Sequence, residues 1–236
     1  CATLAAHGMG QILDFVPNHV GIFGADNRWF LDVLTWGEDS PVAEFFDIDW
    51  RPAKPELHGK LLVPLLGDSY GTILSNGELK LALDAGENGF SVWYYENRLP
   101  LAPPTYGRIL RPAIDRLRQT GALDPAHDGQ LALLAAGFDE LRRPARTRPA
   151  RVARFALAER MRTDLAALLQ SDPALRAEID AVIDEINGTP GNAASFRRLH
   201  QLLELQHYRL AYWRVAAEEI NYRRFFQIND LAGVRV

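Results

Sequence analysis

An imidazole and a carboxamide, those of His19 and Asn18, follow an apolar run that ends at Pro17. Only Asp14 is polar within that run, Ile12 to Val16, and such a run predicts a strand covered on both faces of a parallel sheet. Proline has no N–H group to donate, so Pro17 suits the place where the strand leaves the sheet. We therefore expect Asn18 and His19 on a loop beyond the carboxyl end of a strand, where α/β barrels carry their functional side chains.

On that loop, His19 could donate a hydrogen bond to a hydroxyl group of a ligand, and the carboxamide of Asn18 could also bind one. The alternative for a single histidine is a side chain satisfied by nearby backbone, and the residues in front of His19 favour the binding role. A buried charge requires a partner, so we expect Asp14 to orient its neighbours through hydrogen bonds. We count all three among the candidate ligand contacts.

The stretch Tyr222 to Asp230, YRRFFQIND, combines guanidinium donors, two adjacent aromatic rings and two acceptors. If this stretch is extended, neighbouring side chains point to opposite faces, so only one of Phe225 and Phe226 can face a ligand. Trp29 offers another aromatic plane, although a single tryptophan is more often part of a core. The candidate contacts from these two stretches are Trp29, Arg224, Phe226, Asn229 and Asp230.

Paired carboxylates are the other chemical possibility. Asp47 and Asp49 alternate along FFDIDW, which predicts a short edge strand with both acids on one solvated face. Glu219 and Arg223 have the spacing of an ordinary helical ion pair. We therefore expect no catalytic acid pair in this chain. We also expect no cofactor and no metal, because no carboxylate cluster has the ligand spacing of a hard cation.

The residues D-x-V-P-N-H, from Asp14 to His19, resemble the first signature of the alpha-amylase family of glycosidases and transglycosidases. Longer stretches, which cover about a third of the chain, resemble one branch of that family, the maltooligosyl trehalose synthases. These stretches are NRWFLDVLTWGEDSPVAEFFDIDW, LLVPLLGDSYGTILSNGELKLALD and LLELQHYRLAYWRVAAEEINYRRFFQINDLAGVRV.

The resemblance implies an α/β fold that forms part of a TIM-type (β/α)8 barrel, interrupted by a small β-rich unit and a helical subdomain. It implies an isomerase of the glucosylmutase type, which acts on maltooligosaccharides and turns the reducing-end α-1,4 linkage into an α,α-1,1 linkage. The two carboxylates of such a retaining enzyme lie about 5 Å apart, and we expect both beyond Val236, in the remainder of the barrel. Two alternatives remain open: another amylase-type hydrolase or glucanotransferase, and an inactive structural fragment.

Apolar periodicity and turn residues predict the elements that would position these side chains. We expect a helix capped by Asp26 or Asn27 that ends at about Trp36, a strand over 60–66 with Pro64 at an edge or bulge, and a hairpin of 78–84 with 90–96. We expect helices over 106–119, 128–142, 150–170, 173–187 and 193–206, and strands within 208–213 and 221–228. The predicted units are 1–46, in the barrel, 47–105, β-rich, 106–206, helical, and 207–236, back in the barrel.

Composition limits the partners. The 236 residues are 47% hydrophobic and 24% charged, with a formal net charge of -4, which gives no electrostatic reason to expect nucleic acid or an anionic membrane. Arginines are dense over 111–162, and we expect a solvated helical face with ion pairs such as Asp139 with Arg143. Cys1 is the only cysteine, which favours a reducing compartment and hence the cytoplasm. Because the sequence opens without methionine and stops in mid-pattern, we expect an internal piece of a longer protein.

Overall fold

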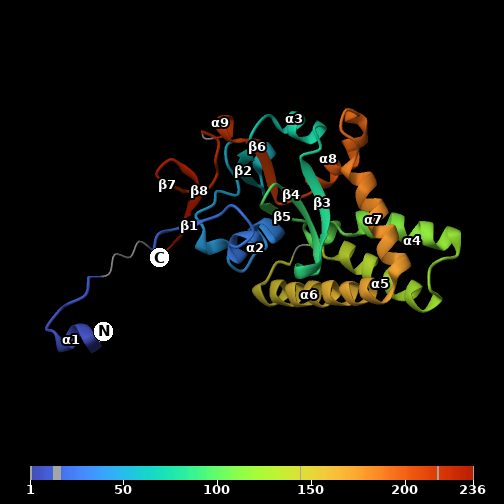
Figure 1. Ribbon diagram of the computed structural model, residues 1–236, viewed down its shortest axis with the longest axis horizontal. Helices are drawn as coiled ribbons and strands as arrows, with labels where there is room; N and C mark the ends of the chain where they lie inside the picture. The colour runs from blue at the N-terminus through green and yellow to red at the C-terminus, as the bar shows by residue number, and fades with distance from the viewer. Residues whose placement is uncertain (1, 13–16, 144, 217, 236) are drawn as a thin grey trace.

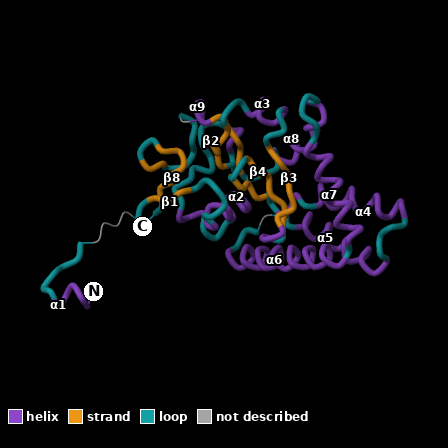
Figure 2. Tube along the Cα trace, viewed as in Figure 1, coloured by secondary structure: helices purple, strands orange, loops and turns teal. Residues whose placement is uncertain are grey.

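Short strands gather toward one end of the molecule and helices cover the other (Figures 1 and 2). The computed structural model describes residues 2–12, 17–143, 145–216 and 218–235. The strands are β1 (His19–Gly21), β2 (Leu61–Leu66), β3 (Leu79–Asp84), β4 (Gly89–Tyr94), β5 (Asn97–Pro100), β6 (Tyr208–Tyr212), β7 (Arg224–Phe225) and β8 (Ile228–Gly233). The helices are α1 (Ala2–Ala6), α2 (Arg28–Trp36), α3 (Tyr70–Ser75), α4 (Gly107–Thr120), α5 (Pro125–Glu140), α6 (Arg148–Ser171), α7 (Pro173–Asn187), α8 (Arg197–Leu203) and α9 (Trp213–Ala216).

The described strands form three small sheets. One is antiparallel in the order β1-β8-β7, one is the parallel pair β2-β6, and one is antiparallel in the order β3-β4-β5. The fold is therefore mixed helix and sheet, as predicted. No closed barrel is formed by the described residues, so the predicted part of a (β/α)8 barrel is not confirmed. The pairing of β2 with β6 also joins the predicted β-rich unit to the last predicted unit.

Several predicted elements are confirmed. Helix α2 begins where the side chain of Asn27 accepts a hydrogen bond from the Phe30 N–H at 3.0 Å, and it ends at Gly37. Strands β3 and β4 form the predicted hairpin, whose turn includes Asn88 at a φ of 51°. The register of β2 shifts between Val63 and Leu66, around Pro64, because proline cannot donate to the neighbouring strand. The helices of the middle region lie within a few residues of their predicted bounds.

Most of the predicted first barrel strand lies outside the described residues, but the placement of His19 is corrected. Ile12 is outside any strand and its side chain is 99% exposed, while Leu13, Asp14, Phe15 and Val16 lie outside the described residues. His19 is not on a loop; it is the first residue of the antiparallel strand β1. Asn18 lies in the turn before it.

Two further expectations about acids are also corrected. FFDIDW is not a strand, since Phe46 and Ile48 form only isolated bridges, to Val234 and Tyr222. Glu219 and Arg223 do not form a helical pair: Glu219 contacts Lys54 at 2.5 Å, and Arg223 contacts Asp47 at 3.5 Å.

The arginine-rich region does form a network of ion pairs, but not with the predicted partners. Asp139 pairs with Arg111 and Arg142, and Arg143 pairs with Glu140 instead. Two arginines of α6 are largely buried and tie that helix to other elements: Arg154 reaches Asp39 at 2.6 Å, and Arg162 reaches the backbone of the β3–β4 turn. The main hydrophobic cluster runs from α2 through β2 to β4 into α4 to α8, and a small second cluster joins Leu57 and Leu62. Among the described residues, no helix combines the length and the apolar character needed to cross a membrane.

Candidate functional site

The two motif-bearing ends of the chain meet in one sheet. Strand β8 pairs with β1 on one side and β7 on the other, with His19 opposite Gly233 and Arg224 opposite Ala232 (Figure 1). Asn18 joins the same sheet through its carbonyl oxygen, which accepts the Val234 N–H at 2.9 Å. Candidate contacts from both ends of the sequence therefore lie on one small surface, which we call the rim sheet (β1, β8 and β7).

Aromatic stacking fixes the imidazole of this surface. The ring of His19 lies parallel to that of Phe225, with 3.8 Å between ring centroids and 18° between planes. The Asn18 side-chain oxygen is 3.0 Å from Nδ1 of His19, which holds the ring from its edge. Phe226, the predicted ligand contact, lies in the turn between β7 and β8, packs edge-on against Phe225, and is 80% exposed. Phe225 is thus a residue of the site that the sequence reasoning left undecided.

Polar bonds fix the rest of the rim sheet. Arg224 donates from Nη1 to the side-chain oxygen of Asn229 at 2.6 Å, so two of the candidate contacts bind each other. The Tyr222 hydroxyl donates to the Asn229 carbonyl oxygen at 2.5 Å, and burial raises the pKa of this hydroxyl above its usual range. Asp230 accepts the Ile22 N–H through its backbone, at 2.9 Å, and its exposed side chain remains available to a ligand.

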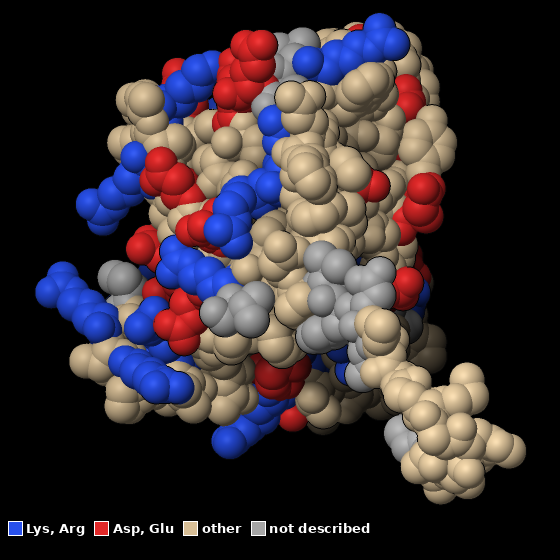
Figure 3. Space-filling model, turned by 90° about the vertical axis from the view of Figure 1, so that its left-hand side faces the viewer, with Lys and Arg blue, Asp and Glu red and all other residues tan. Residues whose placement is uncertain are grey.

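Trp29 lies in α2 and is 53% exposed, so it is no core residue. Its ring stacks on that of Phe45, with 4.9 Å between centroids. The carbonyl oxygen of Phe45 accepts the Arg235 N–H at 2.8 Å, which places this aromatic pair beside the end of β8. Figure 3 shows this end of the molecule, where basic and acidic side chains are interspersed among uncharged residues.

Asp47 and Asp49 do not form an acid pair suited to proton transfer. Asp47 contacts Arg235 at 2.9 Å and Arg223 at 3.5 Å, and the hydrogen bond from Arg235 lowers the pKa of this carboxyl below its usual value. Asp49 accepts the backbone N–H of Arg51 at 2.9 Å. An ionised, paired carboxylate is a poor general acid. In the part of the chain that the structure describes, no group of three or more His, Cys, Asp or Glu side chains could hold a metal, and the absence of a metal site stays a prediction.

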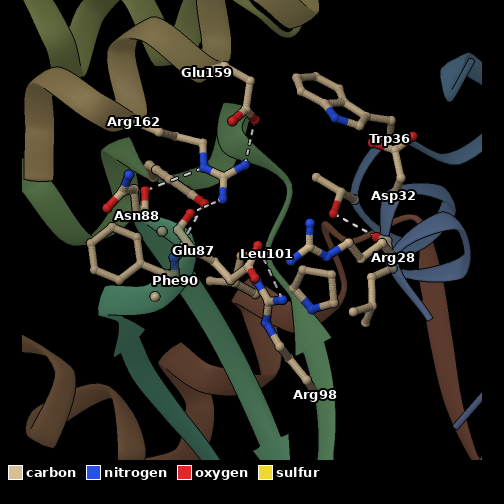
Figure 4. A pocket seen from close by; sticks show the side chains of 16 residues that line it. Arg28, Asp32, Trp36, Glu87, Asn88, Phe90, Arg98, Leu101, Glu159 and Arg162 are labelled. Atoms are coloured by element: carbon tan, nitrogen blue, oxygen red, sulfur yellow. Dashed lines mark hydrogen bonds and ion pairs between the residues drawn. The ribbon is translucent and has the colours of Figure 1, made fainter. Parts of the chain in front are cut away.

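A cavity of about 380 Å³ lies apart from His19, which is not among its lining residues. It lies between α2, the β3–β4 turn and α6, and Figure 4 shows charged side chains pointing into it from all three. Its polar lining residues are Arg28, Asp32, Thr35, Glu87, Asn88, Arg98, Tyr106, Glu159 and Arg162. The sequence reasoning missed this cavity, because its walls come from segments with no common motif.

Comparison with known proteins supports the resemblance carried by the motifs. No protein-family model matches the chain. Over 94 residues, or 36% of the chain, it is 39% identical to a protein of Mycobacterium tuberculosis (strain H37Rv) named a maltooligosyl trehalose synthase. The chain is similar to the maltooligosyl trehalose synthases. The protein of that name in M. tuberculosis (strain CDC 1551) matches to the same extent.

Solved maltooligosyl trehalose synthase structures match along the whole chain. The enzyme from Arthrobacter ramosus is 27% identical, with a TM-score of 0.51, and the match covers 100% of this chain and 18% of that one. A second maltooligosyl trehalose synthase structure, 20% identical with a TM-score of 0.50, covers 99% of this chain and 18% of its own and supports the fold alone. The residues aligned with the M. tuberculosis maltooligosyl trehalose synthases make up 12% of those proteins, so the chain spans a small part of its relatives' length.

Proposed function

We propose that this chain is part of an enzyme that isomerises the reducing end of maltooligosaccharides from an α-1,4 to an α,α-1,1 linkage, as the names of its relatives suggest. The observation that supports this best is the pairing of β1 with β8. It brings His19 and Asn18 of the first signature beside Arg224, Asn229 and Asp230, at the other end of the sequence.

In this proposal the rim sheet contacts the sugar. His19, held flat against Phe225, presents its remaining ring nitrogen to a glucose hydroxyl, and the exposed carboxylate of Asp230 accepts another. Phe226 and Trp29 offer exposed rings to the apolar face of a glucose unit. Asp14 belongs to the same proposal on sequence grounds alone.

A retaining mechanism accounts for both steps at one site. A nucleophilic carboxylate breaks the terminal α-1,4 bond and forms a covalent glycosyl-enzyme; the freed glucose turns, and its anomeric hydroxyl attacks that intermediate. We assign the nucleophile and the acid/base residue to parts of a longer protein outside these 236 residues, because Asp47 and Asp49 are already engaged. The partners in this proposal are a maltooligosaccharide and the rest of a barrel, and the location is the cytoplasm.

Water must be excluded while the glucose turns, since water would otherwise hydrolyse the intermediate. We propose that the helical region serves as a wall against it. Removal of residues 106–190 from the longer protein should then raise hydrolysis relative to isomerisation, and an unchanged ratio would contradict this role.

Maltopentaose as substrate separates the proposal from its alternatives, in assays of a longer protein that contains this chain. Isomerisation removes reducing ends without release of glucose, whereas a hydrolase creates reducing ends. Phe226→Ala should raise KM, while the matched control Leu133→Ala, a 76% exposed apolar residue on α5, should leave it unchanged. Growth of reducing ends would favour the sister hydrolase. Equal KM values for both variants would remove Phe226 from the site.

The isolated 236-residue chain should convert no maltopentaose, since its best acid pair is engaged in other bonds. Any turnover by the isolated chain would show that the catalytic carboxylates lie within it.

A further inference from the structure

The cavity between α2, the β3–β4 turn and α6 has fixed walls. Arg98, only 9% exposed, contacts Asp84 at 2.6 Å and Glu87 at 3.6 Å. Arg162, 14% exposed, contacts Glu159 at 2.6 Å and also donates to the backbone of the turn. Both guanidinium groups are therefore held in place before any ligand arrives, which lowers the cost of ordering a binding site.

The charges that line this cavity balance. Three arginines (Arg28, Arg98 and Arg162) face three carboxylates (Asp32, Glu87 and Glu159). A phosphate or a metal cation would meet as many like charges as opposite ones, so neither gains from the local field. A hydroxyl group both donates and accepts hydrogen bonds, and a mixed set of fixed donors and acceptors suits it.

Some of the lining groups have unused bonding capacity. The guanidinium of Arg28 has no hydrogen-bond or ion-pair partner among the described residues, and Figure 4 shows it pointing into the cavity. Asp32 accepts from the Ser40 hydroxyl with one oxygen, at 2.5 Å, and its other oxygen has no described partner. The hydroxyl oxygen of Tyr106 accepts the Phe90 N–H at 3.3 Å, while its proton reaches no described acceptor.

Tyr106 is 2% exposed, so an unused donor there is costly unless something else accepts it. A side chain at Gly89 would put its Cβ 2.4 Å from the Tyr106 hydroxyl, so the glycine leaves room for this group at the cavity wall.

We propose that this cavity binds a neutral, hydroxyl-rich ligand of the size of one or two sugar rings, at a site separate from the rim sheet. Its volume of about 380 Å³ falls within the range of about 300–1,000 Å³ typical of small-molecule sites. No residue of β1, β7 or β8 lines it. The inference rests on the cavity and not on the proposed reaction.

Titration of the 236-residue chain with maltose, followed by the backbone amide signals, tests this site. The signals of Asn88 and Gly89 should shift saturably, with a Kd in the millimolar range. Arg28→Gln should weaken binding about tenfold, the loss of one charge-assisted hydrogen bond. The control Arg51→Gln, an exposed arginine outside the cavity, should leave the Kd unchanged.

Three outcomes would overturn the inference: no shift at Asn88 and Gly89, an unchanged Kd in Arg28→Gln, or displacement of maltose by inorganic phosphate. Shifts confined to Phe226 and Gln227 would overturn it and still leave the proposed function standing. Shifts confined to amide signals of the cavity residues would support the cavity site, even if no signal of the rim sheet shifts.

Discussion

The carboxamide of Asn221 ties two other main-chain segments, at Asp49 and at 60–62, to its own segment next to the rim sheet. Its oxygen accepts the Leu62 N–H at 2.9 Å, and its nitrogen donates to the carbonyl oxygens of Asp49 at 2.9 Å and Lys60 at 2.8 Å. Asn221 is 5% exposed, so water cannot replace these bonds without local opening. We therefore expect its removal to be among the most damaging polar substitutions in the chain.

Asn221→Ala removes three hydrogen bonds, each with a net value of about 1 kcal/mol, and leaves buried backbone groups unpaired. The free energy of unfolding should fall by about 3–4 kcal/mol, and the Tm by about 10 °C for a chain of this length. Urea unfolding and a thermal scan measure the two quantities. Asn229→Ala is the matched control, because Asn229 is half-buried and its side chain accepts a single bond, from Arg224; it should cost about 1 kcal/mol.

Asn221→Asp sharpens the test, because a carboxylate there would face the carbonyl oxygens of Asp49 and Lys60. Repulsion and burial would raise the folded-state pKa of the new acid, so its penalty should be larger at pH 7 than at pH 4. A loss below about 1 kcal/mol for Asn221→Ala, or one equal to that of Asn229→Ala, would refute the reasoning.

Three other predictions concern His207, Arg98 and Phe226. Burial lowers the pKa of His207 from 6.5 to about 4, so the unfolded chain binds the proton first as the pH falls. Between pH 7 and pH 4, the free energy of unfolding should fall by about 3 kcal/mol more in the parent chain than in His207→Asn. Equal falls in the two proteins, measured by urea unfolding at each pH, would contradict this. Arg98→Met leaves the carboxylate of Asp84, 15% exposed, without its ion-pair partner and with a hydrogen bond from the Ser91 hydroxyl, which should cost about 3 kcal/mol in urea unfolding, and Asp84→Asn in the same chain should recover part of it. Phe226 has a φ of 53°, so Phe226→Gly should be about 1 kcal/mol more stable than Phe226→Ala in the same assay, and equal stabilities would exclude strain there.

Local signals in the sequence were sufficient for most elements. The cap at Asn27, the proline at the start of α7 and the turn at Asn88 act through neighbouring atoms, so their effects can be predicted from short stretches. The bulge around Pro64 follows in the same way from a missing N–H group.

Long-range pairing could not be predicted from such signals. The apolar run before Pro17 suggested a buried parallel strand, yet the first described strand after it, β1, owes its place to β8, at the other end of the sequence. The ion-pair partners of Asp47 are also far from it in the sequence. Local spacing pairs Arg223 with Glu219, but the fold brings Arg223 and Arg235 to Asp47. The cavity between α2, the β3–β4 turn and α6 could not be predicted for the same reason, since Arg28, Arg98 and Arg162 share no local sequence pattern.

The join between β1 and β8 closes a very long loop, because His19 lies opposite Gly233. The entropy lost on closing a flexible loop grows only with the logarithm of its length, by about 0.6 kcal/mol for each doubling. Insertions or deletions between these two strands should therefore disturb the rim sheet little, provided that the chain between β1 and β8 keeps its own hydrophobic core. Related proteins can then differ widely in the size of their helical region while they keep the pairing of the two strands that correspond to β1 and β8.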